Sequence, residues 1–105
     1  DDLADACLFV MGLPRETYAA ATQPMLSHLN VGTGTDVSIG ELAALVGEAT
    51  GFRGRIVFNR DYPDGTPRKL LDVSRLARLG WQARTGLRDG IAATCDWYRA
   101  NAARA

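Results

Sequence analysis

Apolar residues at the start of the chain recur every three or four positions. This spacing places them on one side of an α-helix. The stripe consists of Leu3, Ala6, Cys7, Val10 and Met11. The pattern predicts an amphipathic helix over residues 1–11 that ends near Gly12. Leu3, Cys7 and Val10 should pack on another body of protein; without it, they should be exposed or covered by a second copy of the chain.

The clearest helix signal lies in the middle of the chain. Ser38 and Glu41 have the spacing of a capping box, in which the two residues satisfy each other's backbone N–H groups. Apolar residues at helical spacing follow until Gly51, a residue typical of helix ends. Residues 39–50 should therefore be helical.

Two further helices are expected near the carboxyl terminus. Asp72 can cap a short helix that stops at Gly80 and leaves Trp81 to pack beneath it. Thr85 can cap a terminal helix over about residues 86–100. The tail from Ala100 to Ala105 should fray.

Two short apolar runs read as β-strands. They cover residues 26–31, with His28 half-buried among them, and residues 55–58. Residues 15–24, by contrast, read as irregular. A strand, a helix and a strand in this order indicate a βαβ unit, so the expected fold class is α/β, with a few helices and two short parallel strands.

Length and composition indicate one globular domain spanning residues 1–105. No apolar run is long enough to cross a membrane, and the acidic start is unlike a signal peptide. Cys7 and Cys95 form no Cys-x-x-Cys pair and His28 is the sole histidine, so no metal site is expected. The thiols read as buried and reduced, which indicates a cytoplasmic protein. Because the sequence begins at Asp1 inside a predicted helix, we expect it to be part of a longer chain.

The formal net charge of zero hides an asymmetry. Residues 1–52 carry one cation and seven anions, whereas residues 53–88 carry nine cations and three anions. The basic stretch could serve a phosphate-bearing partner, because arginine presents a planar fork of donors. It could equally be a solvated surface whose charges pair with the acidic half. Nucleic acid is a poor candidate, because acids interrupt the stretch and no recognition motif accompanies it.

Local motifs reveal no catalytic apparatus. Gly32 and Gly34 follow a predicted strand and precede a helix, but the third position of a dinucleotide fingerprint is Val37. A plain structural turn is the alternative reading. No tyrosine is followed four residues later by lysine, and neither cysteine has a nearby histidine to activate it. No catalytic or cofactor-binding residue is therefore assigned.

Three segments together resemble one family of enzymes. They are Asp-Asp-Leu-Ala-Asp-Ala at residues 1–6, Thr-Gln-Pro-Met-Leu-Ser-His-Leu-Asn-Val-Gly-Thr-Gly at 22–34, and Pro-Asp-Gly-Thr-Pro-Arg-Lys-Leu-Leu-Asp-Val-Ser at 63–74. The chain is similar over nearly its whole length to the carboxyl-terminal third of the GDP-L-fucose synthases. The first segment specifies only the extended short-chain dehydrogenase/reductase superfamily. The run 22–28 and the loop 63–69 are more specific.

The resemblance implies a substrate-binding fragment. Its parent would have a Rossmann-type NAD(P)-binding fold and would use NADPH to epimerise and reduce GDP-4-keto-6-deoxy-mannose to GDP-L-fucose, as a cytoplasmic homodimer. Asp64 matches the family's substrate-binding aspartate, and Lys69, with Arg68, matches basic positions that face the diphosphate. The family's cofactor turn and catalytic residues would precede Asp1. The fragment alone should therefore be inactive.

The loop chemistry agrees with this assignment from the residues alone. Pro63 and Pro67 bracket the turn and lower the entropy that the loop would lose around a ligand. The alternatives are the same portion of another nucleotide-sugar epimerase or dehydratase, or an independent interaction module without catalytic activity.

Overall fold

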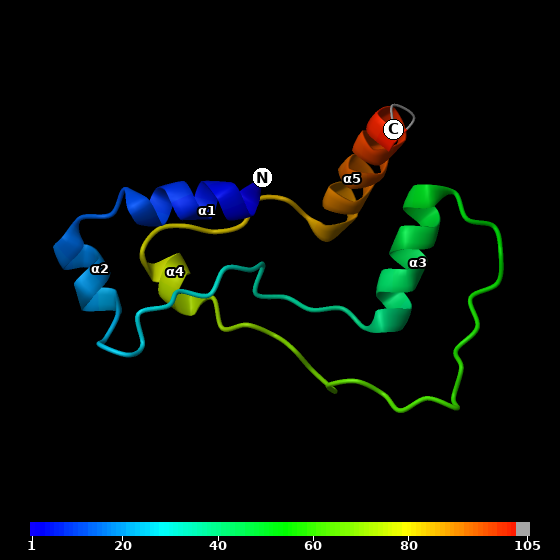
Figure 1. The fold of residues 1–105 in the computed structure, drawn as a ribbon, viewed down its shortest axis with the longest axis horizontal. Coiled ribbons are helices and arrows are strands. Elements are labelled where there is room, and N and C mark those ends of the chain that lie inside the picture. The colour runs from blue at the N-terminus through cyan, green and yellow to red at the C-terminus, as the bar shows by residue number, and fades with distance from the viewer. Residues whose placement is uncertain (103–105) are drawn as a thin grey trace. The chain divides into compact units, whose positions relative to one another are not determined.

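The computed structural model describes residues 1–102, and within them the regular structure is helical (Figure 1). The helices are α1 (Asp2–Met11), α2 (Arg15–Ala21), α3 (Ile39–Thr50), α4 (Ser74–Arg78) and α5 (Leu87–Ala102). The chain forms two compact units. The first combines Asp1–Asp36 with Arg68–Arg84, and the second combines Val37–Pro67 with Thr85–Ala105. Helices α1, α2 and α4 belong to the first unit, and α3 and α5 to the second.

Helix α3 has the bounds that its local sequence predicts. The Glu41 backbone N–H donates to Ser38 Oγ at 3.1 Å, and the Ser38 backbone N–H donates to Glu41 Oε2 at 2.7 Å. These bonds satisfy donors that the first helical turn leaves free. The helix ends at Gly51, whose φ of 74° lies in the left-handed region. The predicted helix over residues 39–50 is confirmed.

The other predicted helices are also present. The N-cap position of α4 is Val73 rather than the predicted Asp72, but Asp72 Oδ1 accepts a hydrogen bond from the Ser74 backbone N–H at 2.9 Å and so satisfies a donor of the first turn. The chain then turns at Gly80, where φ is 103°. Helix α5 continues through Ala102, so fraying from residue 100 onwards is wrong for residues 100–102. The rest of that prediction, residues 103–105, lies outside the described residues.

Helix α2 corrects the expectation that residues 15–24 are irregular. It begins after Pro14, whose φ of −56° suits the entry to a helix. Glu16 lies in its first turn, where a negative charge is favourable, and a run of alanines with high helix propensity completes it. These signals were present in the sequence.

The two predicted strands are not confirmed. Within the described residues, neither 26–31 nor 55–58 forms a strand, and the sole bridge is a local one that joins Leu26 to Gln23 three residues before it. His28 is exposed rather than half-buried. A strand is stabilised by hydrogen bonds to a neighbouring strand, and an isolated apolar run has no such partner. The expected βαβ unit is therefore absent from this part of the chain.

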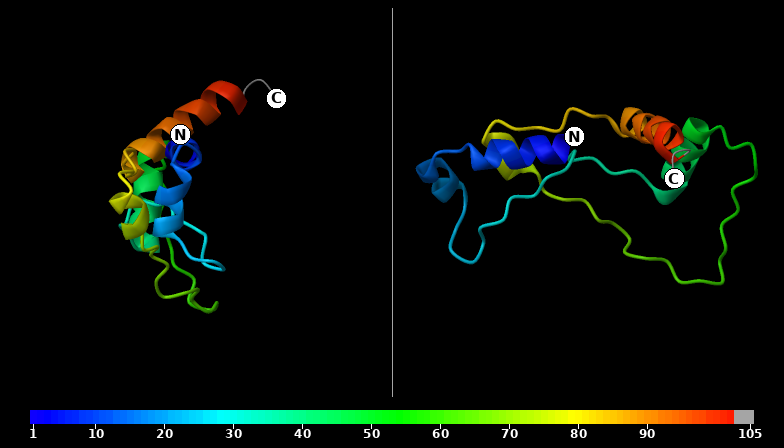
Figure 2. Two further views of the ribbon diagram at one scale, coloured as in Figure 1. Left: turned by 90° about the vertical axis from the view of Figure 1, so that its left-hand side faces the viewer. Right: turned by 45° about the horizontal axis from the view of Figure 1, so that its top comes forward.

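The core of the first unit lies between α1, α4 and the segment after α4. Ala6, Leu76 and Trp81 are buried there, and the segment 79–84 returns beside α1 (Figures 1 and 2). The Trp81 indole N–H donates to Asp5 Oδ2 at 2.8 Å, and the Arg84 backbone N–H donates to Asp2 Oδ2 at 2.8 Å. Trp81 packs beneath α4 as predicted.

Helix α1 has apolar residues on both of its sides. Val10 is half-buried against the core, so its expected exposure is wrong. Leu3, in contrast, is 65% exposed, and Cys7 is exposed rather than buried. Leu3 and Val10 are seven residues apart and so lie on the same side of the helix; they differ because Val10 packs against the core of this unit and Leu3 does not.

The second unit is built on the packing of α3 against α5. The Arg99 guanidinium donates to the Thr50 carbonyl oxygen at 3.0 Å, which satisfies an acceptor at the end of α3. Arg88 forms an ion pair with Glu48 at 2.7 Å. No helix of the described chain is both long and apolar enough to cross a membrane.

Candidate functional site

The loop over residues 63–69 has no regular secondary structure. Its residues through Pro67 belong to the second unit, and Arg68 and Lys69 belong to the first. Asp64 is exposed, and its carboxylate makes no hydrogen bond to any residue of the described chain. It is therefore available to accept hydrogen bonds from a ligand.

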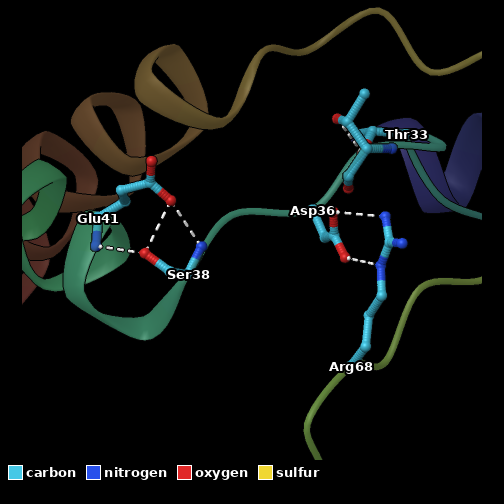
Figure 3. Close-up of polar contacts among 6 residues, drawn as sticks. Thr33, Asp36, Ser38, Glu41 and Arg68 are labelled. Carbon is cyan, nitrogen blue, oxygen red and sulfur yellow. Dashed lines mark hydrogen bonds and ion pairs between the residues drawn. The ribbon is translucent and has the colours of Figure 1, made fainter.

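Arg68 is held by a carboxylate that is distant in the sequence. Its Nε donates to Asp36 Oδ2 at 2.7 Å and its Nη2 donates to Asp36 Oδ1 at 3.2 Å, a bidentate pair (Figure 3). Hydrogen bonding from Arg68 lowers the pKa of the Asp36 carboxyl below its ordinary value of 3.8 and raises the pKa of the arginine. Each group therefore stabilises the charged form of the other.

Lys69 follows this pair directly, and its own ammonium is free. It is exposed and has no hydrogen-bond or ion-pair partner among residues 1–102. A few residues later the chain is anchored again, where the Asn30 side-chain amide donates to the Asp72 carbonyl oxygen at 3.1 Å. Lys69 thus presents an uncompensated positive charge from a backbone held on both sides.

The glycine turn before α3 has a packing role. A Cβ atom on Gly34 would lie 3.0 Å from a methyl group of Val73, and Gly34 has a φ of 76°. Gly32 lies against the side chains of Val73 and Leu71. Close approach and a left-handed backbone together favour glycine at position 34, whereas Gly32 has no positive φ and would make only ordinary contacts.

Asp36 is the residue that sequence reasoning missed. It precedes the capping box without belonging to it, and Arg68 lies 32 positions further along the chain. The opposite charges of the two halves of the sequence were the available signal. Pairing between the halves was one of two interpretations left open for these charges, and Asp36–Arg68 and Glu48–Arg88 are two such pairs.

Lys69 and Asp64 expose groups of the kind that contact ligands. A free ammonium suits a phosphate oxygen, and a free carboxylate suits hydroxyl or amide donors. Among residues 1–102, no group of three or more His, Cys, Asp or Glu side chains gathers to hold a metal ion.

Comparison with known proteins reveals close relatives, although no protein-family model matches the chain. It is 52% identical to the GDP-L-fucose synthase of Escherichia coli K12 over 96% of its own length and 32% of that protein. It is 48% identical to the putative GDP-L-fucose synthase 2 of Arabidopsis thaliana, over 96% of this chain and 28% of that protein. The chain therefore spans about a third of the length of the curated relatives it matches.

Two solved structures of enzymes with GDP-sugar names are also similar to this chain. A GDP-D-glycero-L-gluco-heptose synthase from Campylobacter jejuni, crystallised in the presence of NADPH, is 36% identical with a TM-score of 0.80, over 94% of this chain and 28% of that one. A GDP-mannoheptose C4 reductase from the same organism, with NADP bound, is 36% identical with a TM-score of 0.77, over 94% of this chain and 29% of that one. These likenesses are consistent with the expected fold of the extended short-chain dehydrogenase/reductases, although the described residues form helices and no strands.

Proposed function

We propose that this chain, which matches the carboxyl-terminal part of the GDP-L-fucose synthases, forms the GDP-sugar-binding portion of such an enzyme. The observation that carries the proposal is the 40–52% identity to proteins of that name over at least 96% of the chain. The complete enzyme would use NADPH to epimerise and reduce GDP-4-keto-6-deoxy-mannose to GDP-L-fucose.

The roles within the site follow from its chemistry. Lys69 binds the diphosphate of the GDP-sugar, and Asp64 accepts hydrogen bonds from donors on the nucleotide. A preceding Rossmann-type domain supplies the NADPH site and the reacting groups. This chain by itself is expected not to oxidise NADPH in the presence of the keto sugar.

The exposed apolar surface supports a larger parent structure. Leu3, Leu8 and Met11 of α1 are 65%, 70% and 82% exposed, although such residues are usually covered. A helix that is apolar on both sides is typical of a buried position in a larger body. We propose that the cofactor domain covers this face and that residues 26–31 and 55–58 become strands by pairing with it.

Titration of GDP into the full-length protein by calorimetry tests the site. A lysine-to-diphosphate contact is a charge-assisted hydrogen bond worth about 1.5–3 kcal/mol, so Lys69→Ala should weaken binding about 10- to 100-fold. Asp64→Asn keeps the size of the side chain and one acceptor oxygen. It should cost less affinity than Asp64→Ala.

Matched controls separate specific contacts from bulk charge. Arg53→Ala removes an exposed cation of the same basic stretch, and Asp61→Asn removes an exposed carboxylate of the same loop region. Both should leave the dissociation constant within about twofold, because neither residue is assigned a contact with the nucleotide and salt screens exposed charges. If the Lys69 and Asp64 variants also stay within that range while folded, the loop is a structural turn and the site assignment fails.

A second candidate is a reductase of another GDP-sugar. It is favoured by the two Campylobacter structures, whose names specify GDP-heptoses. Turnover of GDP-4-keto-6-deoxy-mannose and of a GDP-4-keto-heptose by the full-length protein distinguishes the two. Preference for UDP- or dTDP-sugars would instead indicate another class of nucleotide-sugar enzyme, and absence of nucleotide binding would indicate an interaction module.

A further inference from the structure

The ion pair between Asp36 and Arg68 lies at a particular place in the chain. Asp36 is the last residue before the chain leaves the first unit, and Arg68 is the first residue after it returns. The pair therefore links the two residues of the first unit that flank the 37–67 segment. Two parallel N–H···O contacts fix both the distance and the orientation of the guanidinium (Figure 3).

Stability alone is a poor explanation for this pair. The Asp36 and Arg68 side chains are 39% and 69% exposed, and exposed ion pairs contribute little to the free energy of folding. A bidentate arginine contact does, however, restrict geometry strongly. The pair is thus better suited to setting the position of the backbone at residue 68 than to holding the fold together.

The surroundings of the pair make that position well defined. Thr33 and Thr35 bond to each other across the turn that presents Asp36, and the positive φ of Gly34 shapes that turn. On the other side of the contact, Asn30 holds the Asp72 carbonyl oxygen. The segment 68–72 is therefore attached to the segment 30–36 at both of its ends.

Lys69 lies inside this doubly attached segment with its ammonium unpaired among residues 1–102. Arg68, its neighbour, already has a carboxylate partner, which reduces its net attraction for phosphate. The two adjacent cations therefore differ in their interactions within the protein. One is neutralised by a partner in the protein, and the other is free for a ligand.

We propose that Asp36 is a positioning residue that holds Lys69, through Arg68, in place for the diphosphate of the GDP-sugar. This inference rests on the function proposed above. Asp36 does not touch the ligand itself. Arg68 acts as the link between the glycine turn and the binding segment rather than as a main diphosphate contact.

Two single variants of the full-length protein test the link. Asp36→Asn removes the charge and one acceptor, and Arg68→Lys keeps the charge but loses the planar fork. Each should raise the dissociation constant of GDP about three- to tenfold, less than the loss of Lys69 itself. The KM for the GDP-sugar should rise by a similar factor while kcat stays within about twofold, because positioning acts on binding. The exchange Asp36→Arg with Arg68→Asp should restore most of the affinity.

A control and a double-mutant cycle complete the test. Glu48→Gln breaks an ion pair of similar exposure in the second unit and should leave GDP binding unchanged. In a Lys69→Ala background, Asp36→Asn should have no further effect, because both act through one contact. Tighter binding in Asp36→Asn, failure of the exchange to restore affinity, or additive losses would overturn the inference. An unchanged affinity in Lys69→Ala would instead overturn the proposed function.

Discussion

Gly34 should tolerate alanine poorly, for two reasons that can be measured separately. Its φ of 76° lies in the left-handed region, and an added Cβ atom would lie 3.0 Å from Val73 Cγ2. Val73 is β-branched, so its side chain has little rotamer freedom with which to move away. The perturbation therefore combines backbone strain with a close contact.

The expected cost follows from these two effects. A left-handed backbone costs a residue with a Cβ about 1–2 kcal/mol, and the lower entropy of the unfolded alanine chain returns about 0.4–1 kcal/mol. Relief of the contact with Val73 adds a cost typical of mild overpacking. Gly34→Ala should therefore lower the free energy of unfolding by about 1–3 kcal/mol.

Urea denaturation of three alanine variants separates the effects. Gly51 has a φ of 74°, but a Cβ added there would meet no atom within 4 Å, so Gly51→Ala incurs the backbone cost alone. Gly47 lies inside α3 with open space around it, so Gly47→Ala should stabilise by about 0.5–1 kcal/mol. Adding Val73→Ala to Gly34→Ala should recover the contact cost as a coupling energy.

We expect Gly34→Ala to be the most destabilising variant, Gly51→Ala to be less destabilising, and Gly47→Ala to be stabilising; a different ranking of their unfolding free energies would refute this. If Gly34→Ala is no more destabilising than Gly51→Ala, the contact with Val73 carries no cost. If it matches Gly47→Ala, the turn does not require a positive φ. Zero coupling with Val73→Ala would also show that the two residues are energetically independent.

Two further predictions concern the two units separately. Trp81→Phe removes the indole donor to Asp5 and should lower the free energy of unfolding by about 1–2 kcal/mol in urea denaturation, whereas Trp97→Phe, at 66% exposure, should change it by less than about 0.5 kcal/mol. Hydrogen bonds from Ser38 lower the pKa of Glu41 below its ordinary value of 4.5. The stability that this carboxylate provides is therefore fully present above about pH 4.5 and is lost as the pH falls through the lowered pKa. Unfolding midpoints should show a smaller acid-induced loss in Glu41→Gln than in the wild type; equal losses would contradict the assignment.

Local chemistry determined the helices that could be predicted. The bounds of α3 depend on Ser38, Glu41 and Gly51, which lie within or next to the helix itself. Its hydrogen bonds close over three or four residues, so the sequence specifies them without knowledge of the rest of the fold. Helix α2 was missed although its signal was equally local, because a helix of 7 residues is marginal by propensity alone.

Strands and contacts between distant residues depend on the tertiary structure, unlike the helices. Residues 26–31 and 55–58 have apolar composition suited to strands, but a strand exists only with a hydrogen-bonded neighbour, and none is present in residues 1–102. In the same way, the sequence placed Leu3 and Val10 on one apolar stripe of a helix but did not show that Val10 would be half-buried and Leu3 65% exposed.

The candidate site was likewise predictable only in part from the sequence. The sequence by itself identified the loop with Asp64, Arg68 and Lys69, since its residue types and its resemblance to a family can be read along the chain. Only the tertiary structure showed that Arg68 is paired with Asp36 while Lys69 has no partner among residues 1–102. Many acids could have paired with this arginine, and which one does depends on how the folded backbone brings residues 32 positions apart into contact.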